Sequence, residues 1–176
     1  MSKYRLIHRP ALSDKQPFNA SGIGLTALPE GHVIHVLAEQ GADPSAMLKG
    51  LAEQGHSVRY AAPGQWYIVG DEPLADDALA ALLTRLTPHA EGVDQSHGRV
   101  RILARGPMVE RVLAKGSGTD LALSAFVVGR STTTLIGHIA AHITRVEDHA
   151  FEIMVLRGFA ESLWDDLAQM SAEFAA

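Results

Sequence analysis

The order of strand-forming and helix-forming segments constrains the fold of this chain more than any other feature. His32–Ala38 is an almost continuous apolar run rich in valine and isoleucine, which is typical of a strand buried on both faces. Asp43 and Pro44 follow as an N-cap side chain and a first-turn proline, and Gly55 supplies a stop signal. We therefore expect a strand followed by a helix.

The next segments predict a hairpin and a second helix. Ser57–Gly70 contains two β-forming stretches on either side of a Pro63-Gly64 turn. Leucines recur at positions i, i+3, i+4 and i+7 over residues 76–86, which indicates an amphipathic helix. With a further strand at Arg99–Ala104, the order becomes β-α-β-β-α-β, the ferredoxin-like arrangement of a sheet with helices on one face.

The second part of the chain repeats this mixture of elements. A helix is expected after Gly106-Pro107, and long β segments are expected at residues 131–145 and 151–156. The predicted fold class is therefore α+β, with two ferredoxin-like β-α-β-β-α-β-type halves. A closing helix should run from 159 to about 174, with an apolar stripe of Phe159, Leu163, Leu167 and Met170 and with Trp164 at its margin.

Two regions are expected: residues 1–31 as an extended N-terminal arm and residues 32–176 as a single α+β domain. Proline and glycine are frequent in the first region, and its apolar residues follow no period of 2 or 3.6. Such a segment cannot form a core by itself, so it is either a disordered tail or an arm that lies on a partner. Its apolar content favours the arm: Leu6, Ile7, Phe18, Ile23 and Leu25.

Composition excludes several classes of function. The 176 residues carry a net charge of −5 and dispersed basic side chains, whereas nucleic-acid binding needs lysine and arginine gathered on one face. There is no cysteine, hence no disulfide and no thiolate nucleophile. No apolar run approaches the roughly 20 residues of a membrane span, and the first residues lack the apolar core of a signal peptide. We expect a soluble, cytoplasmic protein without nucleic-acid or membrane partners.

Groups able to perform catalysis are scarce in the sequence. Residues 121–146 contain no carboxylate, and neither a GxSxG nucleophile motif nor a complete GxGxxG loop occurs. His138 and His142 suggest a metal site, but on a strand they would lie about 13 Å apart, too far to share one ion. We therefore predict no catalytic, cofactor-binding or metal-ligating residue in this chain.

Several sequence pieces occur in a recognisable order: APGQWYIVG around Trp66, VDQSHGRVRILARGP from Val93, VLAKGSGTDL ending at Leu121, the Ala125-Phe126 pair with Gly129, and VLRGFAESLW ending at Trp164. Over roughly residues 33–167, this order resembles the gamma subunit of heterotetrameric sarcosine oxidase. That family shares its fold with the folate-binding aminomethyltransferases of glycine cleavage. One departure is Gly158, where the family pattern RSFA would place a serine; glycine adds backbone freedom and removes a hydroxyl cap.

The resemblance implies a subunit without chemistry of its own. The complex oxidises sarcosine with O₂ to glycine, peroxide and a one-carbon unit, which is released as formaldehyde or captured on tetrahydrofolate. FAD, FMN, NAD and tetrahydrofolate are expected on partner subunits, and the partners are the alpha, beta and delta subunits. The aminomethyltransferase relatives use an acidic pair near the strand that corresponds to residues 137–143, where this chain has glycine, histidine, isoleucine and alanine instead.

Trp66, Arg157, Phe159 and Trp164 are the candidate partner-interface residues, because tryptophan and arginine are enriched at the energetic centres of interfaces. A tryptophan at the margin of an amphipathic helix is also a common core residue, so this alternative stays open for Trp164. The expected function is that of a non-catalytic structural subunit. The alternatives are a stand-alone folate-binding or one-carbon transferase-like domain and a scaffold with an unrelated partner.

Overall fold

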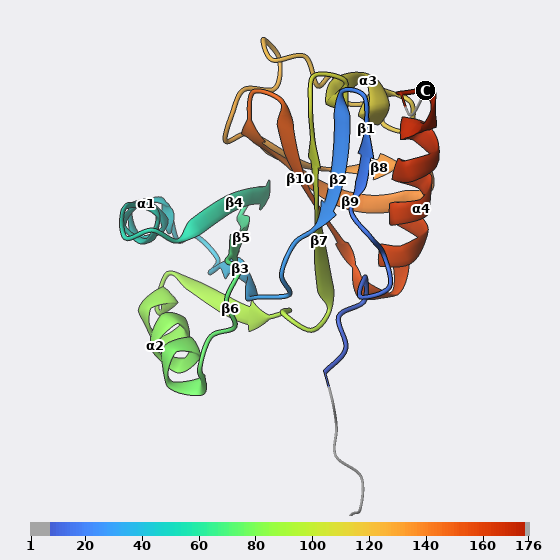
Figure 1. The fold of residues 1–176 in the computed structure, drawn as a ribbon. Helices are drawn as coiled ribbons and strands as arrows, with labels where there is room; N and C mark the ends of the chain where they lie inside the picture. The colour runs from blue at the N-terminus through green and yellow to red at the C-terminus, as the bar shows by residue number, and fades with distance from the viewer. Residues whose placement is uncertain (1–7, 175–176) are drawn as a thin grey trace, which may run out of the picture.

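Two antiparallel β-sheets pack against each other, and helices cover the outer face of each sheet (Figure 1). The computed structural model describes residues 8–174. Helices α1 (Ser45–Glu53) and α2 (Asp76–Leu86) lie outside a four-stranded sheet, and α4 (Ala160–Ser171) lies outside a six-stranded sheet on the other side of the molecule (Figure 1). The layers therefore follow the order helices, sheet, sheet, helices.

The four-stranded sheet and its two helices come from one continuous stretch of chain. Its strands are β3 (Val33–Ala38), β4 (Ser57–Ala62), β5 (Gln65–Val69) and β6 (Ala90–Asp94), in the spatial order β4-β5-β3-β6. The predicted first strand, hairpin and two helices are confirmed. The outer face of this sheet forms a core with α1 and α2, made of Ile34, Val36, Leu48, Leu51, Ile68, Leu82, Leu86 and Ala90.

The strand that completes this ferredoxin-like unit is β6, and the expectation that residues 99–104 complete it is wrong. The β6 sequence AEGVD is poor in β-forming residues, so it gives no strand signal. Pairing with β3 forms it instead, with Val36 opposite Gly92. A Cβ at Gly92 would lie 2.5 Å from Leu83 Cδ2, so the leucine side chains of α2 pack directly on the backbone of β6 and would have to shift for a larger residue.

The six-stranded sheet has the spatial order β1-β2-β7-β10-β9-β8. Helix α3 (Val109–Ala114), which follows Gly106-Pro107 as expected, and α4 cover its outer face, and Val109, Val112 and Leu113 of α3 are all buried. The strands are β1 (Phe18–Ala20), β2 (Ile23–Ala27), β7 (Arg99–Arg105), β8 (Ser131–Ile136), β9 (Ile139–Glu147) and β10 (Ala150–Leu156). In this half the closing helix follows the last strand, whereas the ferredoxin-like order would place a helix before it.

The first two strands correct the division of the chain at residue 31. Within the described part of the predicted arm, β2 pairs with β7, and Leu25 stands opposite Ala104. Leu12, Ile23 and Leu25 are buried in the core of the six-stranded sheet. The backbone of β2 forms hydrogen bonds with β7, and the apolar side chains of the segment pack in the core of the six-stranded sheet. The segment therefore needs no core of its own. Residues 1–7 of the predicted arm lie outside the described part of the chain.

The predicted β segment at 131–145 is a hairpin of two strands. Gly137 and His138 form the turn between β8 and β9, and Gly137 has a φ of +59°, a left-handed conformation that favours glycine. The second predicted β segment, at 151–156, corresponds to β10, and a short turn joins it to β9. Among residues 8–174, the structure contains no helix with the length and apolar character of a membrane span.

Candidate functional site

The two candidate metal-binding histidines occupy different environments. His138 is exposed in the β8–β9 turn, so its predicted place on a strand is wrong, whereas His142 is buried in β9. Nε2 of His142 lies 2.9 Å from the Tyr60 carbonyl oxygen and donates to it across the two sheets. Burial lowers the pKa of His142, which keeps the imidazole neutral. Among residues 8–174 there is no cluster of three or more histidine and carboxylate side chains that could hold a metal ion.

The place where the relatives carry an acidic pair is the β8–β9 turn and the start of β9. Ile136 pairs with Ile139 on either side of this turn, and Ala140 and Ala141 follow in the strand. Methyl and sec-butyl groups cannot accept or donate a proton. Residues 136–141 therefore hold no carboxylate, and the acidic pair that the resemblance to the aminomethyltransferases implies has no counterpart here.

Trp164 lies in the core, so its prediction as a partner-interface residue is wrong. Its side chain is 4% exposed, and it packs with Leu163 and Leu167 between α4 and the six-stranded sheet. The buried face of α4 differs from the predicted apolar stripe that started at Phe159, because Phe159 belongs to the 3₁₀ turn η1 (Arg157–Phe159) and precedes α4. The buried face of α4 consists of Ala160, Leu163, Trp164, Leu167 and Ser171.

Phe159 does face outward. Its side chain is 52% exposed, and Leu156, three residues earlier at the end of β10, is 47% exposed. Leu156 also lines a surface pocket of about 310 Å³ together with residues of the β6–β7 turn. Two large apolar side chains exposed so close together in the chain are typical of a surface that a partner covers. The contact of Phe159 with a partner stays a prediction.

Arg157 and Trp66 are engaged within the chain. Arg157 Nη1 donates to Glu30 Oε2 at 2.6 Å, and Nη2 donates to the Arg9 carbonyl oxygen at 2.5 Å. Burial would raise the pKa of Glu30, but the hydrogen bonds from Arg157 and the Ala11 amide outweigh it and lower the pKa. Trp66 is half-buried on β5 and packs against the core of the four-stranded sheet. Their roles at a partner surface stay predictions.

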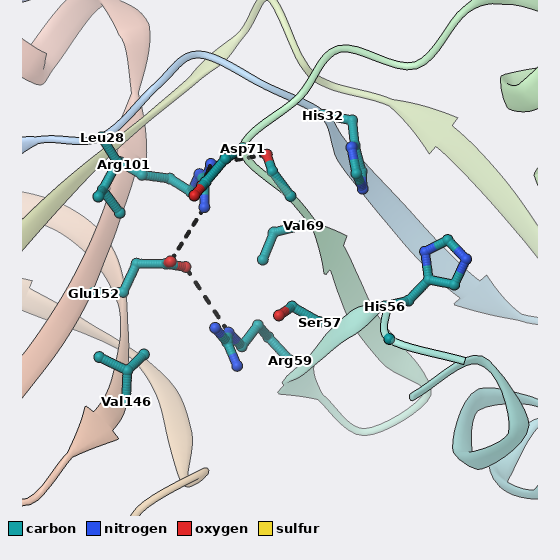
Figure 2. A pocket seen from close by; sticks show the side chains of 12 residues that line it. Leu28, His32, His56, Ser57, Arg59, Val69, Asp71, Arg101, Val146 and Glu152 are labelled. Atoms are coloured by element: carbon teal, nitrogen blue, oxygen red, sulfur yellow. Dashed lines mark hydrogen bonds and ion pairs between the residues drawn. The ribbon is translucent and has the colours of Figure 1, made fainter. Parts of the chain in front are cut away.

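A buried arginine joins the two sheets (Figure 2). Arg101 of β7 donates from Nη1 to Glu152 Oε2 of β10 at 3.2 Å. Its Nη2 donates to Asp71 Oδ1 at 2.7 Å and to the Gly70 carbonyl oxygen at 2.8 Å, both in the loop after β5. Sequence reasoning missed this network. The signal was a charged residue in the middle of an apolar strand, at Arg101 in RVRILA and at Glu152 in AFEIMVL.

The chain segment that connects the sheets runs close to the same loop. A Cβ at Gly31 would lie 2.2 Å from the Gly70 carbonyl oxygen, nearer than any real contact. Gly31 has ordinary backbone angles, so its role is to allow this close approach. Arg101 also donates to the Pro29 carbonyl oxygen at 3.2 Å, which fixes the connection between β2 and β3.

Beside this network lies a cavity of about 370 Å³ between the sheets (Figure 2). Arg59 and Ser57 of β4 line one side, and Arg101 and Glu152 of the six-stranded sheet line the other. The two carboxylates that line it, Asp71 and Glu152, both pair with Arg101, and among the described lining residues no hydroxyl side chain is hydrogen-bonded to a base. Its chemistry is that of a binding pocket.

Comparisons with known proteins give the family. The family described as "Sarcosine oxidase, gamma subunit family" matches residues 33–173. The chain belongs to this family. A search of curated proteins returned no match.

Two solved structures place the fold of this gamma-subunit family member. A chain of the heterotetrameric sarcosine oxidase from Corynebacterium sp. U-96, in complex with pyrrole 2-carboxylate, is similar with a TM-score of 0.83 and 19% identity, over 96% of this chain and 97% of that chain. The glycine cleavage system aminomethyltransferase T from Bartonella henselae is similar with a TM-score of 0.57 and 16% identity, over 84% of this chain. The alignment spans 46% of that aminomethyltransferase chain.

The comparisons also bear on the N-terminal strands and on Gly158. It begins at residue 33, after β1 and β2, yet those strands complete the six-stranded sheet, and the similarity to the Corynebacterium structure covers 96% of the chain. A Cβ at Gly158 would meet no atom within 4 Å, so this position has room for the serine of the family pattern.

Proposed function

We propose that this chain is a non-catalytic structural subunit of a heterotetrameric sarcosine oxidase. The family match over residues 33–173 carries the proposal. The similarity of nearly the whole chain to a chain from an enzyme described as heterotetrameric supports it, because that chain works as one part of an assembly. Its partners in this proposal are the alpha, beta and delta subunits, in the cytoplasm.

The chemistry of the proposed complex resides on the other subunits. They hold FAD, FMN, NAD and tetrahydrofolate and oxidise sarcosine to glycine, peroxide and formaldehyde or 5,10-methylenetetrahydrofolate. The side chains of this chain support that division of labour. The β8–β9 turn lacks the acidic pair of the aminomethyltransferase relatives, and Arg101 and Glu152 pair with each other to connect the sheets.

The outward-facing end of β10 and the turn η1 supply the proposed contact with a neighbour. Phe159 and Leu156 are exposed apolar residues there, and an obligate interface would bury about 2,000 Å² or more in total. Arg157 holds the N-terminal segment beside them through Glu30. The first-half strands and α4 then act as a rigid support for this surface.

Co-purification tests the proposal. An affinity-tagged copy of this chain, expressed in its native cell, should bring down larger subunits that together oxidise sarcosine and release peroxide. Recovery of the tagged chain without any sarcosine-oxidising activity would contradict the proposal.

The second candidate function is a stand-alone folate-binding or one-carbon transferase-like domain. The similarity to the aminomethyltransferase fold favours it, although this chain spans under half of that protein. Titration of the purified chain with tetrahydrofolate, followed by calorimetry, separates the two. Tight binding by the chain alone would favour the transferase-like function, and absence of binding is expected for the structural subunit.

A further inference from the structure

We infer that the cavity between the two sheets binds a monocarboxylate through Arg59. The carboxylate comes either from a small organic acid or from an acidic side chain of a partner protein. The small-acid form of this inference is independent of the proposed function, since it concerns the purified chain.

Arg59 has few partners for a guanidinium in its position. Its side chain is 17% exposed, and its charge contact with Glu152, from Nε to Oε1, is 3.8 Å long, beyond hydrogen-bond range. The buried Nε atom has no hydrogen-bond partner among residues 8–174. Arg101, by contrast, donates to four acceptors around it. A mostly buried guanidinium without such partners is costly unless another acceptor reaches it.

The buried charges beside the cavity do not balance. Arg59, Arg101 and Glu152 are mostly buried, which gives two positive charges and one negative charge. Asp71, the remaining carboxylate of the network, is 61% exposed, so water screens its charge. One further negative charge next to Arg59 would complete two guanidinium–carboxylate pairs.

The charge balance favours a carboxylate over a phosphate. A phosphate dianion would bring excess negative charge close to Glu152, whereas a carboxylate brings one charge. The planar guanidinium also matches a carboxylate with two parallel hydrogen bonds. Ser57 and His56 line the same cavity next to Arg59, and burial lowers the pKa of His56, so Arg59 supplies the positive charge on this side.

The cavity has room for a small acid and walls that suit its carbon atoms. Its volume is about 370 Å³, and Leu28, Val69 and Val146 line it together with the charged side chains (Figure 2). A ligand that pairs its carboxylate with Arg59 would lay its apolar part on these residues. Such a combination of apolar walls and one charged anchor is common in small-molecule sites.

Titration of the purified full-length chain with acetate tests the inference. We expect saturable binding, detected by line broadening of ¹³C-acetate in NMR spectra. We also expect the midpoint of thermal unfolding to rise by about 2 °C or more in about 100 mM sodium acetate relative to sodium chloride of equal concentration. Absence of saturable acetate binding by the wild-type chain would overturn the inference, and so would binding of inorganic phosphate in preference to acetate.

Variants identify the anchor. Arg59→Met should reduce acetate affinity at least about tenfold, the factor that corresponds to losing one good charged hydrogen-bonding partner. Arg85→Met, which removes an exposed arginine of α2, should retain wild-type affinity. Equal affinity in Arg59→Met would place acetate elsewhere and overturn the assignment. If Arg59→Met does not fold, the NMR signal of the Arg59 side chain in the wild-type chain decides, because it must shift on acetate addition.

The assembled complex distinguishes the two sources of the carboxylate. If a partner's acidic side chain occupies the cavity, acetate binds the isolated chain but not the complex, and Arg59→Met weakens assembly. If a small acid is the ligand, acetate binds both and Arg59→Met leaves assembly intact. If no complex forms at all, the proposed function fails while the acetate titration of the single chain still stands.

Discussion

Gly31 and Gly50 show opposite uses of glycine and allow a matched pair of substitutions. Gly31→Ala should destabilise the chain by about 2 kcal/mol or more, because its Cβ would lie 2.2 Å from a backbone oxygen of the neighbouring loop. Gly50→Ala should stabilise it by about 0.5–1 kcal/mol, since position 50 is partly exposed within α1 and no atom lies within 4 Å of a new Cβ. Urea unfolding of both variants measures the difference.

A Gly31→Ala variant as stable as the wild type would show that the two loops separate readily and that Arg101 does not hold them together. The effect at Gly50 follows from the helix that the sequence predicts. The effect at Gly31 was not predictable from the sequence, because the close approach joins residues 31 and 70 through the tertiary fold. The charged residues inside β7 and β10 did give a sequence signal. Asp71, which accepts a hydrogen bond from Arg101, gave no such signal, because an aspartate in a polar loop is common on any protein surface.

In the closing helix α4 and the turn before it, we expect one aromatic residue to stabilise the fold and another to contribute to assembly. Trp164→Ala should destabilise the isolated chain by about 3–5 kcal/mol, since it removes a buried indole from the core of the six-stranded sheet. Phe159→Ser should change the stability of the isolated chain little, because its ring is exposed, yet it should weaken assembly with the larger subunits. Thermal unfolding and co-purification of each variant measure the two effects.

If Phe159→Ser leaves assembly unchanged, the partner surface does not lie at the end of β10.

At the scale of elements, the sequence predicted every helix and most strands, because leucine spacing and β-branched runs are strong local signals. It missed β1, β2 and β6. All three are short strands: β1 and β6 lie at the edges of their sheets and β2 lies next to the edge. Pairing with a neighbouring strand forms them where their own composition does not.

For the whole molecule, buried histidines make stability depend on pH. Burial lowers the pKa of His142, His35 and His56 from the ordinary value of about 6.5. The unfolded chain therefore takes up protons below about pH 6.5 that the folded chain does not. The free energy of unfolding should fall as the pH is lowered from about 7 to 5, by at most about 1.4 kcal/mol per pH unit for His142 and by less for His35 and His56, which are partly exposed and screened by water.

His142→Gln isolates the contribution of the most buried of the three. Glutamine retains an N–H group for the Tyr60 carbonyl oxygen but does not titrate, so the fall in stability between pH 7 and 5 should be smaller. His138→Gln, at an exposed turn position, is the matched control. Equal pH dependence in His142→Gln and in the wild-type chain would mean that water reaches His142 in the folded state.

The order of the segments along the chain predicted the α+β class. It could not predict the polar contacts between the two sheets, such as those of His142 and Arg101, because they exist only where the two sheets meet.

The two sheets also differ in when their parts become available during synthesis. All strands and helices of the four-stranded sheet lie between residues 33 and 94, so this half is complete once a single uninterrupted stretch has left the ribosome. The six-stranded sheet begins with β1 and β2, but its central strand β10 ends at Leu156 and must insert between β7 and β9. Strands β1 and β2 therefore emerge well before the strand that completes the centre of their sheet, and the surface around Phe159 forms only after β10 has emerged.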